Sequence, residues 1–218
     1  MPLTRTVARV IGGTQRWTPR LGFMILLTAA VWATSSARAA AADADDAWVP
    51  AMRAVHEEFT GERGTFAHFG DSITISRAFW SGLQYAPKNM PPEMSKALGL
   101  VKDYMFDECW DWKGPQYGNQ GRMTIRWADQ NVDRWLKEWN PEVALIMFGT
   151  NDLNSLGVDE YETKTRKVVQ TCLDNGTIVI LSTIPPRHGR ADKAATFADA
   201  VRKIAREMKV PLTDYHAE

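Results

Sequence analysis

Apolar and polar residues are arranged between residues 48 and 215 in a pattern that predicts helices separated by short buried strands. Continuous apolar runs of strand length are typical of strands that are covered on both faces. Such strands, joined by segments of helical periodicity, favour a parallel sheet with helices on both sides. The runs predicted as strands are residues 66–69, 143–148, 177–183 and 210–215, and a further strand is expected near residues 100–105.

Apolar residues spaced three or four positions apart predict the helices between these strands. Glycine residues near 61 and at 176 mark where two of the helices stop. The positions expected on the apolar faces are Trp48, Met52, Val55 and Phe59; Ile73, Ala78, Phe79 and Leu83; Ile125, Ala128, Val132, Trp135 and Trp139; Tyr161, Thr165, Val168 and Cys172; and Ala194, Phe197, Val201, Ile204 and Met208.

Two of the predicted strands end in short polar turns. Residues 70–72 are Gly-Asp-Ser, and residues 149–152 are Gly-Thr-Asn-Asp. A buried strand, a tight glycine turn and a helix would place the Ser72 hydroxyl at the mouth of the sheet, beside backbone N–H groups. This arrangement suits a nucleophile with an anion-stabilising cradle. Taken alone, Gly-Asp-Ser is more typical of ordinary helix-capping residues.

Together the two turns resemble blocks I and III of the SGNH, or GDSL, hydrolases. The resemblance implies an α/β fold, a flavodoxin-like three-layer sandwich with a central parallel sheet of about five strands. It implies Ser72 as the nucleophile, with three oxyanion donors: the Ser72 N–H, the Gly121 N–H and the Asn151 side chain. Gly121 is the preferred match to the block II glycine, and Gly118 is the alternative. The carboxylates that precede Ser72 and follow Asn151 are expected to shape the turns.

A serine nucleophile needs a base, usually a histidine held by an acid. In the family these two residues form an Asp-x-x-His block after the fifth strand, and no such block occurs up to Glu218. The sequence is therefore expected to be truncated before this block and to be inactive as given. His216, two residues after Asp214, is kept as the alternative base. The other histidines are expected on the first helix, in the core and in a loop.

The first 39 residues have the pattern of a secretory signal peptide. Four arginines precede a short apolar core that begins at Leu21, and Ala-Arg-Ala at residues 37–39 offers a cleavage site. We expect residues 40–64 to form a linker and the first helix, and residues 65–218 to form the hydrolase domain without its C-terminal part. Export to the periplasm or the extracellular space follows, without stable membrane insertion after cleavage. An uncleaved anchor is the alternative.

The composition excludes few function classes, but it bears on the kinds of binding partner that are expected. The formal net charge is +0, so nothing favours nucleic acid or an anionic membrane surface. The spacing of potential ligands suggests no metal site, and no cofactor is expected. An oxidising compartment would permit a disulfide between Cys109 and Cys172, although Cys172 is expected in the core. Trp80, Trp110 and Trp112 are more readily explained by core packing than by sugar stacking.

These observations favour an exported serine esterase that removes acyl groups, acetyl among them, from carbohydrate or small-molecule esters. A lipid esterase or thioesterase on the same scaffold is the nearest alternative. A non-catalytic binding module or pseudoenzyme, which would keep the fold and lack the base, is an alternative of a different class. The acyl group, the alcohol and the oligomeric state are not encoded in any recognisable motif.

Overall fold

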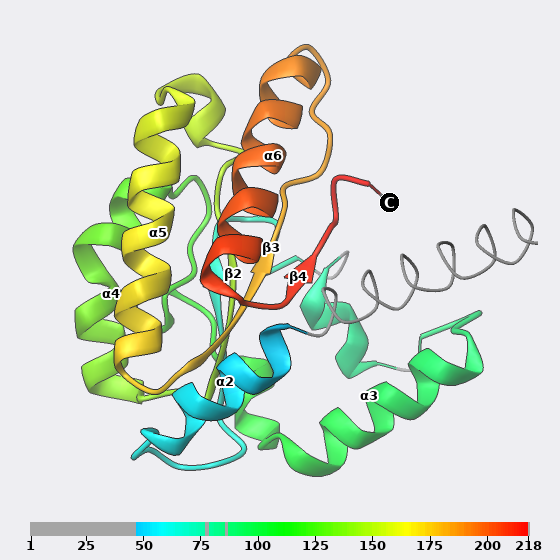
Figure 1. Cartoon of the computed structure of the whole chain (residues 1–218). Helices are drawn as coiled ribbons and strands as arrows, with labels where there is room; N and C mark the ends of the chain where they lie inside the picture. Colours follow the sequence, from blue (N-terminus) through cyan, green and yellow to red (C-terminus); the bar gives the residue numbers. More distant parts are fainter. Residues whose placement is uncertain (1–46, 77–78, 86, 218) are drawn as a thin grey trace, which may run out of the picture. The chain divides into compact units, whose positions relative to one another are not determined.

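The computed structural model describes residues 47–76, 79–85 and 87–217, which form one compact unit (Figure 1). Within this part, four parallel strands pair in chain order. Residue pairs such as Phe66 and Val143, or Leu145 and Ile180, lie in register across the sheet. The parallel α/β architecture is confirmed, with four strands where about five were predicted. The strands are β1 (Phe66–Gly70), β2 (Val143–Met147), β3 (Ile178–Ser182) and β4 (Leu212–Thr213).

The strand predicted near residues 100–105 is wrong, because this segment ends the helix α3 (Pro92–Tyr104). Its short apolar run, including Leu100 and Val101, fits either kind of element. The helix is favoured by Pro92 in its first turn and by the good helix formers that follow it. Helix α3 buries none of its residues, and Leu100 is 64% exposed.

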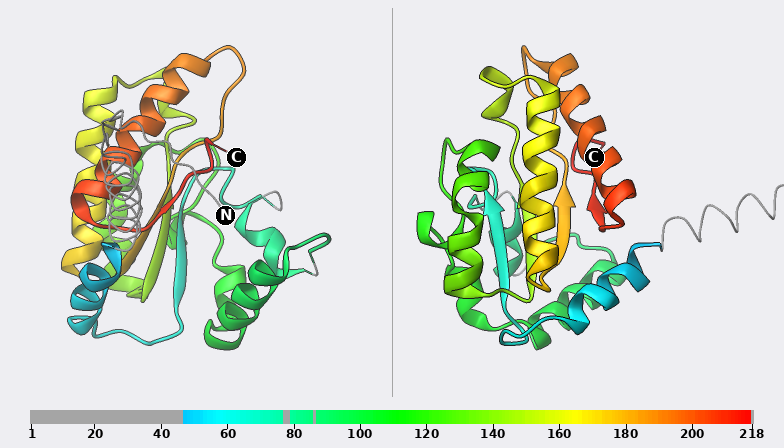
Figure 2. Two further views of the ribbon diagram at one scale, coloured as in Figure 1. Left: turned by 45° about the vertical axis from the view of Figure 1, so that its right-hand side comes forward. Right: turned by 60° about the vertical axis from the view of Figure 1, so that its left-hand side comes forward.

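Three helices pack on one face of the sheet, as both views in Figure 2 show. They are α4 (Ile125–Trp139), α5 (Val158–Asp174) and α6 (Ala191–Met208). Their apolar faces contact alternate strand residues, among them Phe69 and Ile146, in one continuous core. The predicted inward positions are buried in all three helices, except Trp139 and Met208, which are half-buried. Burial of this face supplies most of the apolar contacts of the described unit.

The other face of β1 and β2 is covered by irregular structure rather than by long helices. A smaller core joins Phe66 and Leu145 to Met105, Cys109 and Trp110. Trp80 lies between two rings, with centroid distances of 4.3 Å to Phe66 and 5.1 Å to Trp110. Trp80 and Trp110 therefore pack in the core. The short 3-10 helices are η1 (Trp80–Gln84), η2 (Asp107–Asp111), η3 (Pro115–Tyr117) and η4 (Asp152–Asn154).

Cys109 and Cys172 are both free thiols in buried positions. The Cys109 sulfur accepts a hydrogen bond from the Phe66 N–H at 3.3 Å, and Cys172 is fully buried on α5. The expected signal peptide lies outside the described residues. None of the helices in the described ranges is long and apolar enough to cross a membrane.

A buried carboxylate, Glu142, joins three segments at the edge of the sheet where the strands begin. The side chain is enclosed, and the residue as a whole is 3% exposed. Its oxygens lie 2.7 Å from His56 Nε2 on α2 (Trp48–Glu57), 2.6 Å from the Gly64 nitrogen and 2.8 Å from the Tyr104 hydroxyl at the end of α3. Because buried carboxylates are stable only with such partners, Glu142 fixes the start of β1 and β2.

Candidate active site

The chain turns sharply after β1. A Cβ at Gly70 would lie 2.1 Å from Thr74 Cγ2 and 2.7 Å from the Met147 carbonyl oxygen, so only glycine fits there. Asp71 accepts the Ile73 N–H on Oδ1 at 2.9 Å, and the Thr74 hydroxyl donates to the Asp71 carbonyl at 2.8 Å. These local bonds favour turns over a helix. The α-helix predicted to begin at Ser72 is therefore wrong for the described residues 71–76, which form turns and leave Ser72 exposed.

A loop takes the place of a strand along the outer edge of β1. The Gly70 N–H donates to the Gly118 carbonyl at 3.0 Å, and the Gln120 N–H donates back to the Gly70 carbonyl at 3.1 Å. Asn119, which is fully buried, holds the loop in place. Its amide donates to the carbonyls of His68 and Trp112 at 3.0 Å and 2.9 Å. Nothing in the local sequence pattern had singled out Asn119.

This loop distinguishes the two candidate oxyanion glycines. Gly118 has φ +82°, and a Cβ there would lie 2.2 Å from the Phe69 ring, so this glycine is required for packing. A Cβ on Gly121 would meet a single neighbour within 4 Å, the Ser72 Cβ at 3.7 Å. Gly121 therefore lies directly beside Ser72, whereas Gly118 packs against Phe69.

Asn151 connects the turn after β2 to the turn after β1. Its Nδ2 donates to Asp71 Oδ2 at 2.9 Å and to the Met123 carbonyl at 3.0 Å. The structure thus brings Ser72, Gly121 and Asn151 to the edge where the strands end, which is where open parallel sheets build their sites. Both amide hydrogens of Asn151 already have acceptors, so an oxyanion bound there would share or replace one of these bonds.

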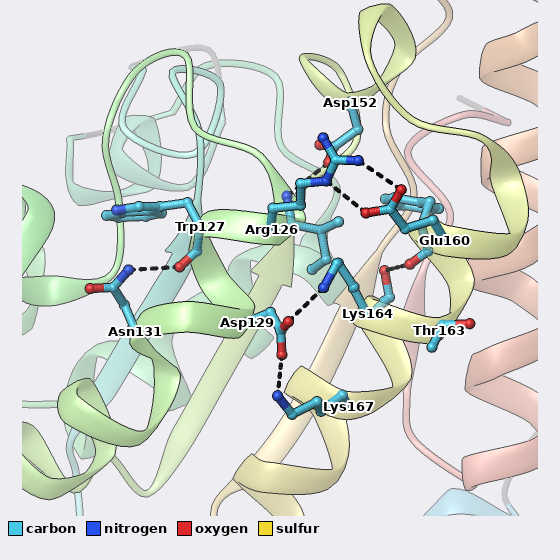
Figure 3. A network of polar contacts seen from close by, with 12 residues as sticks. Arg126, Trp127, Asp129, Asn131, Asp152, Glu160, Thr163, Lys164 and Lys167 are labelled. Carbon is cyan, nitrogen blue, oxygen red and sulfur yellow. Dashed lines mark hydrogen bonds and ion pairs between the residues drawn. The ribbon is translucent and has the colours of Figure 1, made fainter.

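Asp152 links the turn after β2 to the start of α4. Its Oδ1 accepts the Ile125 N–H at 2.9 Å and so caps the start of α4 (Figure 3). The side chain is fully buried, and Oδ2 has no partner among the described residues. Burial is the largest cause that raises the pKa of Asp152 to about 6, and the neighbouring charge of Asp71 adds to it. Exposed ion pairs such as Arg126–Glu160 tie the same end of α4 to α5.

Asp71 is also buried, at 1% exposure, and burial raises its pKa. The Ile73 N–H, the charge of Arg187 and the Asn151 amide oppose that increase. The two buried carboxylates are thus bound to backbone and amide donors, which fits the structural role expected for them. Among the described residues, no cluster of histidine, cysteine and acidic side chains could hold a metal ion.

The family model described as GDSL-like Lipase/Acylhydrolase matches residues 68–218, from β1 onward. The chain belongs to this family. No curated protein matches the chain.

Solved structures of two esterases and of one G-D-S-L family protein share the fold. An acetyl xylan esterase, AlAXEase, has a TM-score of 0.51 at 19% identity over 70% of this chain and 77% of that one. A variant of Axe2, an acetyl-xylooligosaccharide esterase from Geobacillus stearothermophilus, has a TM-score of 0.50 at 19% identity, covering 73% and 79%. A protein from Desulfitobacterium hafniense DCB-2, described as lipolytic and of the G-D-S-L family, has a TM-score of 0.52 at 15% identity, covering 68% and 75%. At these identities the similarity shows a common fold.

None of the described histidines is hydrogen-bonded to Ser72 in this family member. His56 binds Glu142 at the opposite edge of the sheet. His68 is fully buried without a side-chain partner in the described part, and burial lowers its pKa to about 4. His216 lies at the correct edge, but its Nδ1 contacts the Ile184 carbonyl at 3.0 Å after β3. Asp214 binds Thr183 and Arg202 instead of His216.

Asp152 should make the stability of this unit depend on pH. Its pKa of about 6 lies above the ordinary 3.8, so the folded state holds the proton more tightly than the unfolded state. The free energy of unfolding should therefore fall as the pH rises from about 4 to about 6. Asp152→Asn should lack this contribution. Between the two pH values, its free energy of unfolding should therefore fall by less than that of the wild type, with a difference on the order of 2–3 kcal/mol. Urea unfolding of both proteins at each pH measures it, and parallel pH curves would contradict the expectation.

Proposed function

We propose that this GDSL-type protein is an exported serine esterase that hydrolyses acyl esters of carbohydrates or small molecules. The observation that carries the proposal is the exposed Ser72 beside Gly121, with Asn151 joined to the same turn through Asp71. An exposed hydroxyl flanked by backbone and amide donors suits attack on an ester carbonyl. Family membership supports ester hydrolysis as the reaction class.

In this mechanism Ser72 Oγ attacks the carbonyl carbon, and the carbonyl oxygen becomes negatively charged. The N–H groups of Ser72 and Gly121 and the Asn151 amide would stabilise that charge. Each such donor typically contributes about 3 kcal/mol to the transition state. The alcohol then leaves, and water hydrolyses the acyl-enzyme to free the acid and restore Ser72.

The same proposal includes slow turnover by the chain of 218 residues. Ser72 must lose a proton during attack, and none of the described histidines is hydrogen-bonded to it: His56 and His216 contact other groups, His68 is buried, and His188 is exposed in the loop before α6. His216 follows β4, which is two strands away from β2 and three from β1 in the sheet order, and its ring is directed to Ile184. Without a base, the oxyanion donors supply only part of the rate acceleration. His216→Ala should accordingly leave the rate unchanged, and a large loss would identify His216 as the base.

The substrate class rests on the leader and on the structural relatives. AlAXEase and Axe2 are described as esterases of acetylated xylan and xylooligosaccharides, and we propose carbohydrate acetyl esters for this chain by that likeness. Export is proposed from the basic leader, the apolar core and the Ala-Arg-Ala site. Mass spectrometry of the exported protein should then find Ala40 at the N-terminus, and an intact Met1 would contradict cleavage.

Hydrolysis assays with chemically matched esters test the function. Acetylated xylooligosaccharide, p-nitrophenyl acetate, p-nitrophenyl palmitate and acetyl-coenzyme A should be hydrolysed in decreasing order if the carbohydrate assignment is correct. Preference for palmitate or for the thioester would favour the lipid esterase or the thioesterase. A fluorophosphonate should label Ser72, slowly in the absence of a base, since the phosphonylated serine does not turn over and therefore accumulates. Binding of the oligosaccharide with neither hydrolysis nor labelling would favour a binding module.

A further inference from the structure

Arg187 lies in the loop between β3 and α6, at the edge of the sheet that carries Ser72 and Asn151. Its Nη1 donates to the Thr150 carbonyl, one residue before Asn151. Its charge also acts on Asp71, one residue before Ser72, where it lowers the carboxyl pKa. Arg187 is therefore close to both turns that form the site, although it belongs to neither.

Most of the guanidinium of Arg187 has no protein partner in the described part of the chain. The bond to Thr150 uses one of its five N–H donors, and no described carboxylate lies within ion-pairing distance of it. Three other arginines of this unit are paired with carboxylates: Arg126 with Glu160, Arg166 with Glu162, and Arg202 with Asp214. Asp71 forms no ion pair with Arg187 among the described contacts, and its two oxygens accept hydrogen bonds from the Ile73 N–H and the Asn151 amide.

The side chain of Arg187 is half-buried, so its free donors are partly shielded from water. A half-buried guanidinium with unused donors binds carboxylates well, because its planar fork matches the two oxygens of the anion. The bond to Thr150 holds one side of the group and leaves the remaining donors to a ligand. Asp71 and Asp152, the buried carboxylates near Ser72, each accept a backbone N–H on Oδ1, and neither forms an ion pair with Arg187 in the described part of the chain.

We propose that Arg187 determines specificity by binding a carboxylate of the substrate, so that the site prefers esters with an anionic group near the scissile bond. The inference rests on the proposed esterase function and deepens it. Half-esters of dicarboxylic acids and acyl esters of uronic acids have this chemistry. A purely structural Arg187 would only tie the loop after β3 to the turn after β2, with equal consequences for charged and neutral esters.

Two p-nitrophenyl esters of similar size separate these roles: the succinate monoester, which is anionic, and the neutral butyrate. Wild-type protein should show a higher kcat/KM for the succinate ester. Arg187→Gln should lower the succinate-to-butyrate ratio by at least about tenfold, mainly through KM, and Arg187→Lys should keep part of the preference. Arg166→Gln, which removes a charge from the surface of α5, should leave the ratio unchanged. Equal losses on both esters in Arg187→Gln would overturn the inference.

A binding experiment keeps the inference testable if no hydrolysis is detected, an outcome that would count against the esterase proposal alone. Calorimetric titration with monomethyl succinate and with methyl butyrate uses no catalytic step. The anionic ester should bind wild-type protein at least about tenfold more tightly than Arg187→Gln, and 0.5 M NaCl should weaken that binding. Equal affinity of the two proteins for monomethyl succinate would overturn the role of Arg187 whatever the assays show.

Discussion

Ser72→Ala is expected to reduce ester hydrolysis to the residual rate that binding and the oxyanion donors alone supply, and to abolish fluorophosphonate labelling. The substitution removes the only atom that would form the acyl-enzyme, while the Gly121 and Asn151 donors remain in place. Loss of the nucleophile in serine hydrolases leaves only the contribution of binding and oxyanion stabilisation, a reduction of about 10³-fold or more in an enzyme with its full set of catalytic groups. Because slow turnover is expected here, labelling is the more sensitive measurement.

The fold should survive this change, since Ser72 is exposed at the turn. The thermal midpoint of Ser72→Ala should therefore equal that of the wild type within about 2 °C. Ser95→Ala is a matched control, because Ser95 is an exposed serine on α3, away from the β1 turn. Undiminished hydrolysis by Ser72→Ala, with labelling of another residue, would show that the nucleophile has been assigned wrongly.

Glu142→Ala is expected to cause the largest loss of stability, about 3–5 kcal/mol in the free energy of unfolding. The carboxylate accepts hydrogen bonds from His56, the Gly64 N–H and Tyr104 in a buried setting. Alanine would leave the Gly64 N–H without an acceptor and open a cavity where α2 and α3 meet the sheet. Urea unfolding followed by tryptophan fluorescence measures the change.

Tyr104→Phe provides the control, because it removes one hydrogen bond to the same carboxylate from a residue that is 57% exposed. A loss of no more than about 1 kcal/mol is expected there. A loss below about 1 kcal/mol in Glu142→Ala itself would mean that water replaces the missing oxygens without cost.

The strands and long helices could be predicted because burial leaves a regular trace in the sequence. The run at residues 143–148 has no polar interruption, and the inward positions of α5 recur at helical spacing. The segment 100–105 has no such regular pattern, since a few apolar residues fit a strand and a helix equally well. The turn after β1 was mistaken for a helix because the Asp71 side chain, rather than the next helical turn, binds the Ile73 N–H.

The candidate site was predictable where its residues directly follow strands. Ser72 and Asn151 stand in turns after strands, whereas Gly121 lies in a loop after η3, and the structure was needed to find Gly121 beside Ser72 and Gly118 packed against Phe69. Asn119 and Arg187 could not be found in this way. Their positions depend on hydrogen bonds to carbonyls 51 and 37 residues away along the chain, and no local pattern encodes such distant contacts.

The paired hydrogen bonds of Gly70, one to the Gly118 carbonyl and one from the Gln120 N–H, make the turn at residues 70–72 and the loop at residues 118–121 a single mechanical unit. A displacement of β1, caused by repacking beneath Phe69 for example, would carry both segments along together. The spacing between Ser72 and Gly121 is then set by peptide geometry rather than by the volume of core side chains. Substitutions in that core can therefore accumulate, and alter stability, while the alignment of these two residues is kept.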